Sequence, residues 1–448
     1  MKRIAILALI LCSCCASVAW SQEQSVGQHF GKYPVPHHAR QNRPAQSSAA
    51  TSNSTLSPQP AAAAQKSRFW DLGTYPDGTW AQLMDINGWG VAVGLGDTGN
   101  GYDQTLDPPR GYTRPIGIAL FGRDAMKWFD LGTFGGESYE NTYQTALTAC
   151  MGIADTGMIV GLAPTTDDPV TKAVKYDRAF AWTPESGLVD LGTLEKRGFH
   201  NSNAIGVNKL GTVIVGWSGP TVDFTGPPLP VAWTPSIVGK EGRRVTSWKI
   251  HELDTKGFEQ FPYWVAETAN VSGQIVGFAF DDSGAQIAVL WNPLPHGLGW
   301  KAMQLPASSE YPDYINTWAG GINEKGEIVG TITNADYSSD LPALWRPADH
   351  QRQTYKLTVL RTLSGLPGSY GDPAAINDLG DIVGTTYDPP DYNSVPTLWS
   401  AGNPDFVQAL DLQGYFGVAN KVNDFRIVVG GYWSDSCPQG CAAAMQIR

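Results

Sequence analysis

The chain has 448 residues, of which only 16% are charged, and it contains 50 Gly and 31 Pro. This composition leaves no long amphipathic helical pattern and supplies many turns, as expected of a large all-β protein. The formal net charge of −11 argues against nucleic acid or an anionic membrane as a partner, because both require a basic face.

Residues 1–21 have the pattern of a signal peptide. Lys2 and Arg3 precede an apolar run from Ile4 to Leu11, and small residues then allow cleavage after Ala19 or Ser21. The run is too short to span a bilayer, which needs roughly 20 apolar residues. We therefore expect a secreted or periplasmic protein with a cleaved signal peptide and no transmembrane segment.

A second processing route is open, because the residues around Cys14 resemble a lipobox. Acylation of Cys14 would anchor the chain to a membrane as an outer-surface lipoprotein. We favour simple cleavage of the signal peptide over this alternative.

Residues 22–67 are rich in Ser, Ala, Pro and Gln. Such a segment cannot bury an apolar core, so we predict a disordered spacer between the export signal and the folded part.

From residue 68 onward a short phrase recurs seven times. It consists of an apolar residue that is usually followed by Asn, then a tight turn, a Gly, an apolar pair and a second Gly. The clearest copies read INEKGEIVG (Ile322 to Gly330) and INDLGDIVG (Ile376 to Gly384). The closing glycines are Gly94, Gly161, Gly216, Gly277, Gly330, Gly384 and Gly430. Their separations of 46 to 67 residues suit four-stranded blades with variable loops.

Each repeat contains four strand signals in a fixed order. The first two form a hairpin around the polar turn, and the third is an apolar strand that usually ends in Trp, often followed by Pro. The fourth carries the phrase DLGT, clearest at Asp130 to Thr133 and Asp190 to Thr193 and weaker around Leu305, Leu360 and Leu410. The tryptophans are Trp182, Trp233, Trp291, Trp345 and Trp399.

The two ends of the chain predict how the repeats close. An isolated fourth strand, Phe69 to Thr74, precedes the first hairpin, and the last repeat stops after its third strand. Pairing these two would remove the open edges that a row of sheets exposes. We therefore predict a seven-bladed β-propeller over residues 68–448, with the N-terminal strand completing the last blade.

The combination of DLGTFGG (Asp130 to Gly136), the Ile-Asn turn and the Val-Gly strand resembles the HAF family of extracellular repeat proteins. The resemblance covers essentially all of residues 69–448. It departs from the pattern at Ala154, where Asn is usual, and in the later fourth strands. It implies an exported, propeller-like protein and no established activity.

The recurrent side chains are interpreted as structural. We expect the tryptophans to pack between neighbouring blades, and Asp71, Asp130 and Asp190 to act at strand ends. The recurrent asparagines precede turns, where a side-chain amide can bond the backbone. A ring of calcium ligands is the alternative, but no dense Asp run repeats beside them.

Cys437 and Cys441 form CPQGC, a spacing that closes a small disulfide in an oxidising compartment. A zinc site would need two further ligands nearby, and none is visible. Cys150 lies in an apolar stretch, as expected of a buried, inert thiol.

Non-recurrent aromatic residues gather in the connections between the fourth strand of one repeat and the first strand of the next. Aromatic rings beside carboxylates and amides can bind a sugar, whereas the alternative is that the rings only pin the loops to the blades. Our ligand-binding candidates are Trp80, Tyr139, Tyr143, Tyr263, Trp264, Tyr314, Trp318, Tyr370 and Tyr415.

The sequence contains no motif of a known catalytic, cofactor or metal site. We therefore assign no catalytic, cofactor-binding or metal-binding residue and expect a monomeric, non-enzymatic protein that binds a glycan or an envelope or extracellular protein. A secreted carbohydrate-active hydrolase or lyase is the first alternative, using carboxylates such as Glu137, Glu140 or Asp313. A purely structural envelope or matrix component is the second.

Overall fold

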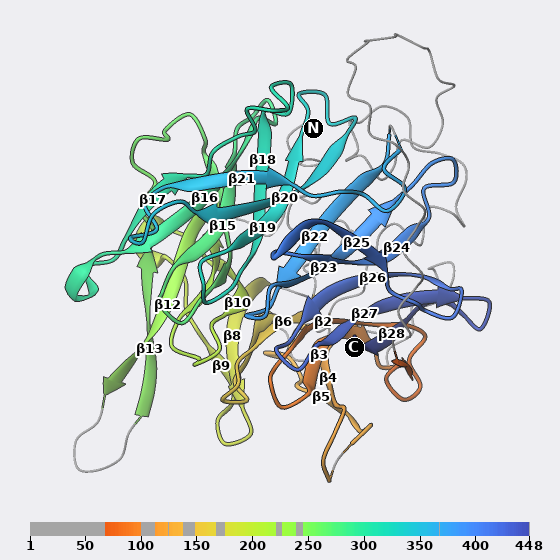
Figure 1. The fold of residues 1–448 in the computed structure, drawn as a ribbon. Helices are drawn as coiled ribbons and strands as arrows, with labels where there is room; N and C mark the ends of the chain where they lie inside the picture. Colours follow the sequence, from red (N-terminus) through yellow and green to blue (C-terminus); the bar gives the residue numbers. More distant parts are fainter. Residues whose placement is uncertain are drawn as a thin grey trace.

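The computed structural model describes residues 68–99, 113–123, 125–137, 148–166, 175–220, 226–238, 245–366 and 368–447. They form seven antiparallel sheets of four strands each, set around a common centre (Figure 1). The prediction of an all-β, seven-bladed propeller is confirmed. Two short 3₁₀ turns, Glu195–Arg197 and Pro295–Gly297, are the helical elements of the described residues, and no helix among them is long and apolar enough to cross a membrane.

The strands of the blades occur in the order that the repeats predict. The first strands are β2 (Ala81–Ile86), β6 (Ala149–Ile153), β10 (Asn201–Val207), β14 (Tyr263–Ala269), β18 (Asn316–Ile322), β22 (Tyr370–Ile376) and β26 (Phe416–Val422). The second strands are β3 (Val91–Asp97), β7 (Ile159–Thr165), β11 (Ile214–Gly219), β15 (Ile275–Phe280), β19 (Ile328–Thr333), β23 (Asp381–Tyr387) and β27 (Ile427–Ser434).

The outer half of each blade is built from the remaining strands. The third strands are β4 (Thr113–Ala119), β8 (Tyr176–Thr183), β12 (Leu229–Val238), β16 (Gln286–Pro293), β20 (Asp340–Pro347), β24 (Ser394–Ser400) and β28 (Cys437–Gln446). The fourth strands are β5 (Trp128–Asp130), β9 (Gly187–Asp190), β13 (Val245–Glu252), β17 (Trp300–Gln304), β21 (Tyr355–Val359), β25 (Asn403–Ala409) and, for the last blade, β1 (Arg68–Gly73).

The first strand of each blade lies at the centre of the ring. It ends each sheet on one side, and it contacts the first strand of the neighbouring blade. A Cβ atom on Gly206 of β10, for example, would lie only 2.3 Å from the carbonyl oxygen of Glu267 in β14. The sequence alone left the order of the strands from centre to rim open, and the sheets decide it.

Closure of the ring follows the prediction from the chain ends. Strand β1 pairs antiparallel with β28, with Arg68 opposite Gln446 and Trp70 opposite Ala444. The first and last blades therefore lie side by side, as the orange and dark blue strands of Figure 1 show.

Each closing glycine marks a place where two backbones nearly touch. A Cβ on any of the seven would lie 1.9 to 2.1 Å from a carbonyl oxygen of the first strand, a distance that no real side chain tolerates. The pairing of the first and second strands shifts register just beyond this contact in all seven blades, which is a β-bulge. The glycine therefore permits the bulge that bends each innermost strand.

The DLGT phrase forms a compact turn at the end of the fourth strand. The Asp130 carboxylate accepts a hydrogen bond from the Gly132 N–H at 2.8 Å, and Gly132 has the positive φ of 78° that favours glycine. Thr133 Oγ1 then donates to the Gly136 carbonyl at 2.8 Å. Asp71 and Asp190 bond Gly73 and Gly192 in the same way, so these acids act at strand ends as expected.

The weaker fourth strands of blades 4 to 6 end one residue before the leucines used to place them. Strands β17, β21 and β25 end at Gln304, Val359 and Ala409. The following leucine is buried and donates its N–H to the third strand, as Leu360 does to the Pro342 carbonyl at 2.8 Å. Burial of this leucine, rather than the Asp or the Gly, is the feature that all seven repeats keep.

The recurrent asparagines bond within and between blades. Asn377 Oδ1 accepts from the Leu379 and Asp381 N–H groups, and its Nδ2 donates to the Asn423 carbonyl of the next turn at 3.0 Å. Asn423 donates in turn to the Asn87 carbonyl at 2.9 Å, across the closure. At Ala154 this relay is interrupted, and the Asp155 N–H instead bonds the Lys209 carbonyl at 2.9 Å.

The recurrent tryptophans pack between blades, as predicted for their positions. Trp233, Trp291, Trp345 and Trp399 are fully buried, and Trp182 is half-buried against Phe129. Trp345 Nε1 donates to the Pro306 carbonyl of the preceding blade at 2.8 Å, and Trp291 Nε1 bonds the Asp254 carbonyl likewise.

The ring has two unlike ends. The connections from second to third strand and from fourth to first strand lie at one end, which we call the loop face. The tight turns that join first to second and third to fourth strands lie at the other end, which we call the turn face. At the centre of the turn face, Lys209 Nζ reaches across the ring to the carboxylates of Asp378 and Asp424.

Replacing a closing glycine tests the backbone contact. We expect Gly330→Ala to lower the free energy of unfolding by about 3 kcal/mol, because its Cβ would overlap the Trp318 carbonyl oxygen and overpacking on this scale is costly. Urea unfolding measures the change. Gly402→Ala is the matched control, since its Cβ would meet only Ser400 Oγ at 3.6 Å, and a similar loss there would contradict this explanation.

A buried carboxyl on strand β14 makes stability depend on pH. Glu267 occupies the bulge of its strand, is 7% exposed, and burial raises its pKa to about 8. Because the folded protein holds this proton more tightly than the unfolded chain, the contribution of Glu267 to stability is greatest below about pH 4.5 and is lost as pH rises towards 8, by up to about 5 kcal/mol. Burial also raises the pKa of Asp177 to about 7, which adds a fall of the same sign. We expect Glu267→Gln to make the total fall smaller, as measured by urea unfolding between pH 5 and pH 9.

The exposed Glu195→Gln serves as the control, because it changes the same charge on the surface. A parallel pH profile for the wild type and Glu267→Gln would show that the buried carboxyl does not cause the dependence.

Candidate functional site

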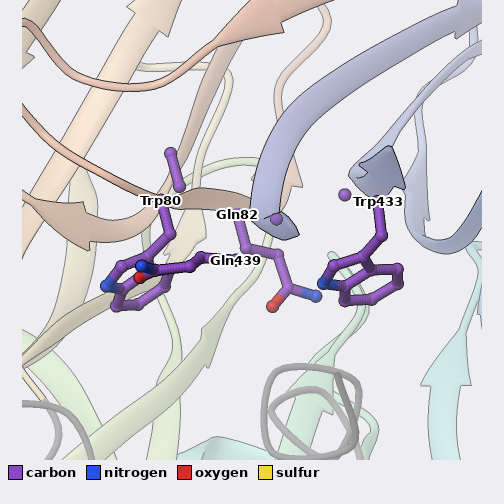
Figure 2. Close-up of a pocket in the computed structure, with 7 residues that line it drawn as sticks. Trp80, Gln82, Trp433 and Gln439 are labelled. Carbon is purple, nitrogen blue, oxygen red and sulfur yellow. The ribbon is translucent and has the colours of Figure 1, made fainter. Parts of the chain in front are cut away.

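A pocket opens on the loop face where the first and last blades meet. It contains about 200 Å³ of empty space that is continuous with solvent. Figure 2 shows the indoles of Trp80 and Trp433 on either side of the Gln82 side chain. Its lining residues are Trp80, Ala81, Gln82, Gly431, Trp433, Gln439 and Gly440.

Trp80 is held by the loop that joins β1 to β2. The buried Asp97 carboxylate, at the end of β3, accepts hydrogen bonds from the Thr79 N–H at 2.5 Å and from Thr79 Oγ1 at 2.6 Å. The same hydroxyl lies 3.1 Å from Gln439 Oε1 of the last blade. Thr79 therefore ties the residue before Trp80 to both blades that form the pocket.

Gln82 reaches towards the last blade from the innermost strand. A Cβ on Gly431 would lie 3.4 Å from Gln82 Cγ, so the glycine leaves just enough room for this side chain. Gln82 is almost fully buried, and its amide lies between the two indoles.

Trp433 and Gln439 come from the hairpin of β27 and β28. The structure pairs Cys437 with Cys441 in a disulfide within this hairpin, with the two Cα atoms 5.9 Å apart. Gly440, which has a φ of 108°, lies against the Trp433 indole: a Cβ there would be 3.1 Å from Nε1. The disulfide closes the loop that presents Gln439 and Gly440, so it restrains one wall of the pocket.

The polar groups of the pocket are uncharged. Its lining side chains are two indoles, two carboxamides and a methyl group. Among the described residues, no hydrogen-bond acceptor meets the buried Nε1 atoms of Trp80 and Trp433. An unpaired buried N–H is costly, so an acceptor that reached either group would gain a hydrogen bond.

Trp80 is the sequence candidate that lines this pocket. Tyr263 and Trp264 are instead buried in blade 4, where Tyr263 stacks on Phe280 at 4.8 Å and Trp264 Nε1 bonds the Phe261 carbonyl. Trp318 is half-buried against the same cluster. These three rings pack onto the blades.

Tyr314 and Tyr370 lie at the loop-face ends of blades 5 and 6. Tyr314 donates to Ser339 Oγ at 2.8 Å, and Tyr370 donates to the Ser338 carbonyl at 3.1 Å. Tyr370 also stacks on Tyr392 with ring centres 5.5 Å apart. Both tyrosine hydroxyls thus bind the same connecting segment, at Ser338 and Ser339, and both rings stay partly accessible.

Two carboxyl groups face each other beneath these tyrosines. Asp340 is 6% exposed, and burial together with the charge of Asp372 raises its pKa well above the usual range. Asp372 accepts a hydrogen bond from Thr331 Oγ1 at 3.2 Å. The two carboxyls resist losing both protons, so Asp340 holds its proton more tightly than a free aspartic acid does.

The remaining candidates are scattered. Tyr415 is exposed on blade 7, with its ring 5.3 Å from that of Tyr432. Tyr139 and Tyr143 lie outside the described residues, as does Glu140. Glu137 is bound by Arg114 at 2.8 Å, and Asp313 is exposed on its loop. Among the described residues, no group of three His, Cys, Asp or Glu side chains could hold a metal ion.

Sequence reasoning did not identify Gln82, Trp433 or Gln439 individually. It did single out CPQGC for its disulfide, and that loop supplies Gln439 and Gly440. The missing signal was the closure itself: pairing the first strand with the last blade brings Trp433 next to Trp80. A search of both closing blades for unmatched aromatics would have found Trp433.

No family model matches the chain, and no curated protein matches it either. Among solved structures, the β-propeller domain of the Trilobed protease from Pyrococcus furiosus is similar at 9% identity and a TM-score of 0.46, covering 80% of this chain and 91% of that one. An acylaminoacyl peptidase is similar at 10% identity and a TM-score of 0.43, covering 80% of this chain and 51% of that chain.

The sialidase of Trypanosoma rangeli is similar at 9% identity and a TM-score of 0.38, covering 84% of this chain and 55% of that one. The chain thus spans about half the length of the peptidase and the sialidase. At these identities and scores, the likeness carries no information about a ligand or a reaction of this chain.

Proposed function

We propose that the protein is a non-enzymatic propeller that binds a neutral glycan in the pocket between Trp80 and Trp433. The supporting observation is the pair of buried indole N–H groups that find no acceptor in the part of the chain that the structure describes, in a pocket lined by uncharged side chains. A sugar offers hydroxyl acceptors to the N–H groups and apolar C–H faces to the rings.

The pocket is shallow and open to solvent, so it would contact one ring of a longer glycan at its mouth rather than enclose a ligand. The carboxamides of Gln82 and Gln439 can donate to and accept from hydroxyl groups, so they would select a polyhydroxylated ring over an apolar one.

Two conservative substitutions test the site. Trp80→Phe and Trp433→Phe keep an aromatic ring and remove the N–H, so each is expected to weaken glycan binding about three- to tenfold, as one neutral hydrogen bond is lost. Binding is measured first on an array of bacterial, plant and host glycans, and then by titration of the best soluble glycan. Any loss of stability should come only from the smaller ring and be small, because the N–H that is removed has no partner among the described residues.

Trp300→Phe is the matched control, for which the opposite changes in stability and binding are expected. Its Nε1 donates to the Gly273 carbonyl at 2.8 Å on the turn face, so this variant should lose stability and keep its binding. If the wild type binds no glycan on the array, the glycan proposal is overturned. An envelope or extracellular protein then becomes the favoured partner.

The carboxyl pair of Asp340 and Asp372 motivates the enzymatic alternative, since glycosidases use a carboxyl of raised pKa together with a second carboxyl. Asp340 lies below the surface, which supports a structural role more than a catalytic one. If a bound glycan is cleaved on incubation, and Asp372→Asn abolishes this cleavage, the protein is a hydrolase rather than a non-enzymatic binding protein.

We further propose that the protein is exported and belongs with the HAF-type repeat proteins that its DLGT and Ile-Asn phrases resemble. The signal peptide and Cys14 lie outside the described residues. The mass of the mature chain recovered from cells should match cleavage after Ala19 or Ser21. A mass that retains Cys14 with acyl groups would establish the lipoprotein, and an uncleaved cytoplasmic chain would contradict export.

A further inference from the structure

Exposed apolar side chains gather on the turn face, opposite to the pocket. Trp89 is 74% exposed, Phe425 67% and Leu379 60%, and all three occupy the same tight turn in their blades. These blades are neighbours, because Asn377 donates to the Asn423 carbonyl and Asn423 donates to the Asn87 carbonyl. The three side chains therefore occupy successive turns of blades 6, 7 and 1, and the Trp89 indole N–H donates to the Asp155 carbonyl of blade 2 at 2.8 Å.

The exposed apolar side chains continue outward along blade 1. A Cβ on Gly90 would lie 2.6 Å from Phe121 Cδ2, so the half-exposed Phe121 ring lies directly beside the Trp89 turn. Phe121 in turn meets the edge of the Trp70 ring of β1, with centroids 6.2 Å apart. We call Leu379, Phe425, Trp89 and Phe121 the apolar arc.

The folded part of the chain begins at the edge of this arc. Arg68 pairs with Gln446, and Gln446 pairs with Ile427, which directly follows the turn that carries Phe425. The 67 residues before Arg68 therefore join the propeller on the turn face. These residues include the predicted lipobox, so an anchor at Cys14 would tether the propeller to a membrane from its turn face, through the predicted spacer of residues 22–67.

The charges near the arc do not oppose a lipid surface. Asp378 and Asp424 occupy the turns beside Leu379 and Phe425, and Lys209 pairs with both. Because the net charge of −11 gives no attraction to anionic headgroups, contact with lipid would rest on the apolar side chains. Tryptophan and phenylalanine are the residues that settle at the boundary between headgroups and acyl chains.

We propose that the apolar arc docks the propeller on a zwitterionic lipid surface. The turn face then lies on the membrane, and the pocket on the loop face points away from it. The arc orients the propeller on the membrane whether or not Cys14 carries lipid.

Vesicle flotation with phosphatidylcholine tests the docking. The full chain carrying Cys14→Ser is used, so that no acyl group contributes to binding. We expect this chain to float with the vesicles and to do so equally well at high salt, because the contact is apolar. The double variant Trp89→Ser/Phe425→Ser should reduce the floating fraction at least tenfold.

The matched control is Tyr415→Ser/Phe416→Ser on the opposite face, where both aromatic rings are also exposed. This variant should float like the parent chain. Equal loss in both double variants, or no flotation of the parent, would overturn the proposal. So would a dimer in light scattering that the arc variant alone abolishes, because a second copy would then cover the arc.

Trp89→Phe tests the lipid contact with a conservative variant that is expected to fold. It preserves an apolar ring, so flotation should persist, whereas quenching of tryptophan fluorescence by brominated phosphatidylcholine should decrease. Unchanged quenching would show that Trp89 does not enter the lipid.

Discussion

The propeller depends on one close approach between two backbones, repeated in every blade. At seven positions the second strand comes so near a carbonyl of the first strand that only glycine fits. The contact coincides with a bulge that bends the innermost strand. Without it, the first strands could not curve around a narrow channel. The Asn relay, the buried leucines and the inter-blade tryptophans stabilise the blades whose innermost strands this contact bends.

Closure of the ring creates the two surfaces with the most functional interest. Where β1 joins β28, the first blade meets the last, and residues far apart in the sequence become neighbours. On the loop face this seam forms the pocket of Trp80 and Trp433. On the turn face the same blades carry Trp89 and Phe425. A propeller that binds with one face and rests on a membrane with the other is consistent with this arrangement.

Much of the fold could be predicted because its signals are local and repeated. The DLGT phrase forms a turn through bonds among neighbours, such as Asp130 to Gly132. The Asn377 side chain accepts a hydrogen bond from the Asp381 N–H, four residues further along the chain. The candidate site was harder. Trp80 precedes a first strand, Trp264 lies in one, and both are 2% exposed, yet Trp80 borders a pocket whereas Trp264 donates its N–H to the Phe261 carbonyl. No local signal separates these two tryptophans.

The sequence by itself determined the number of blades, the closing strand, the glycine contacts and the structural role of Asn and Asp, because each rests on hydrogen bonds and sterics within a few residues or on a periodic repeat. The tertiary structure alone decided which aromatic rings stay accessible and which polar groups lack a partner. Accessibility depends on how non-repeating loops pack onto neighbouring blades. The two indole N–H groups of the pocket come together where blades 7 and 1 meet, and neither has an acceptor among the described residues.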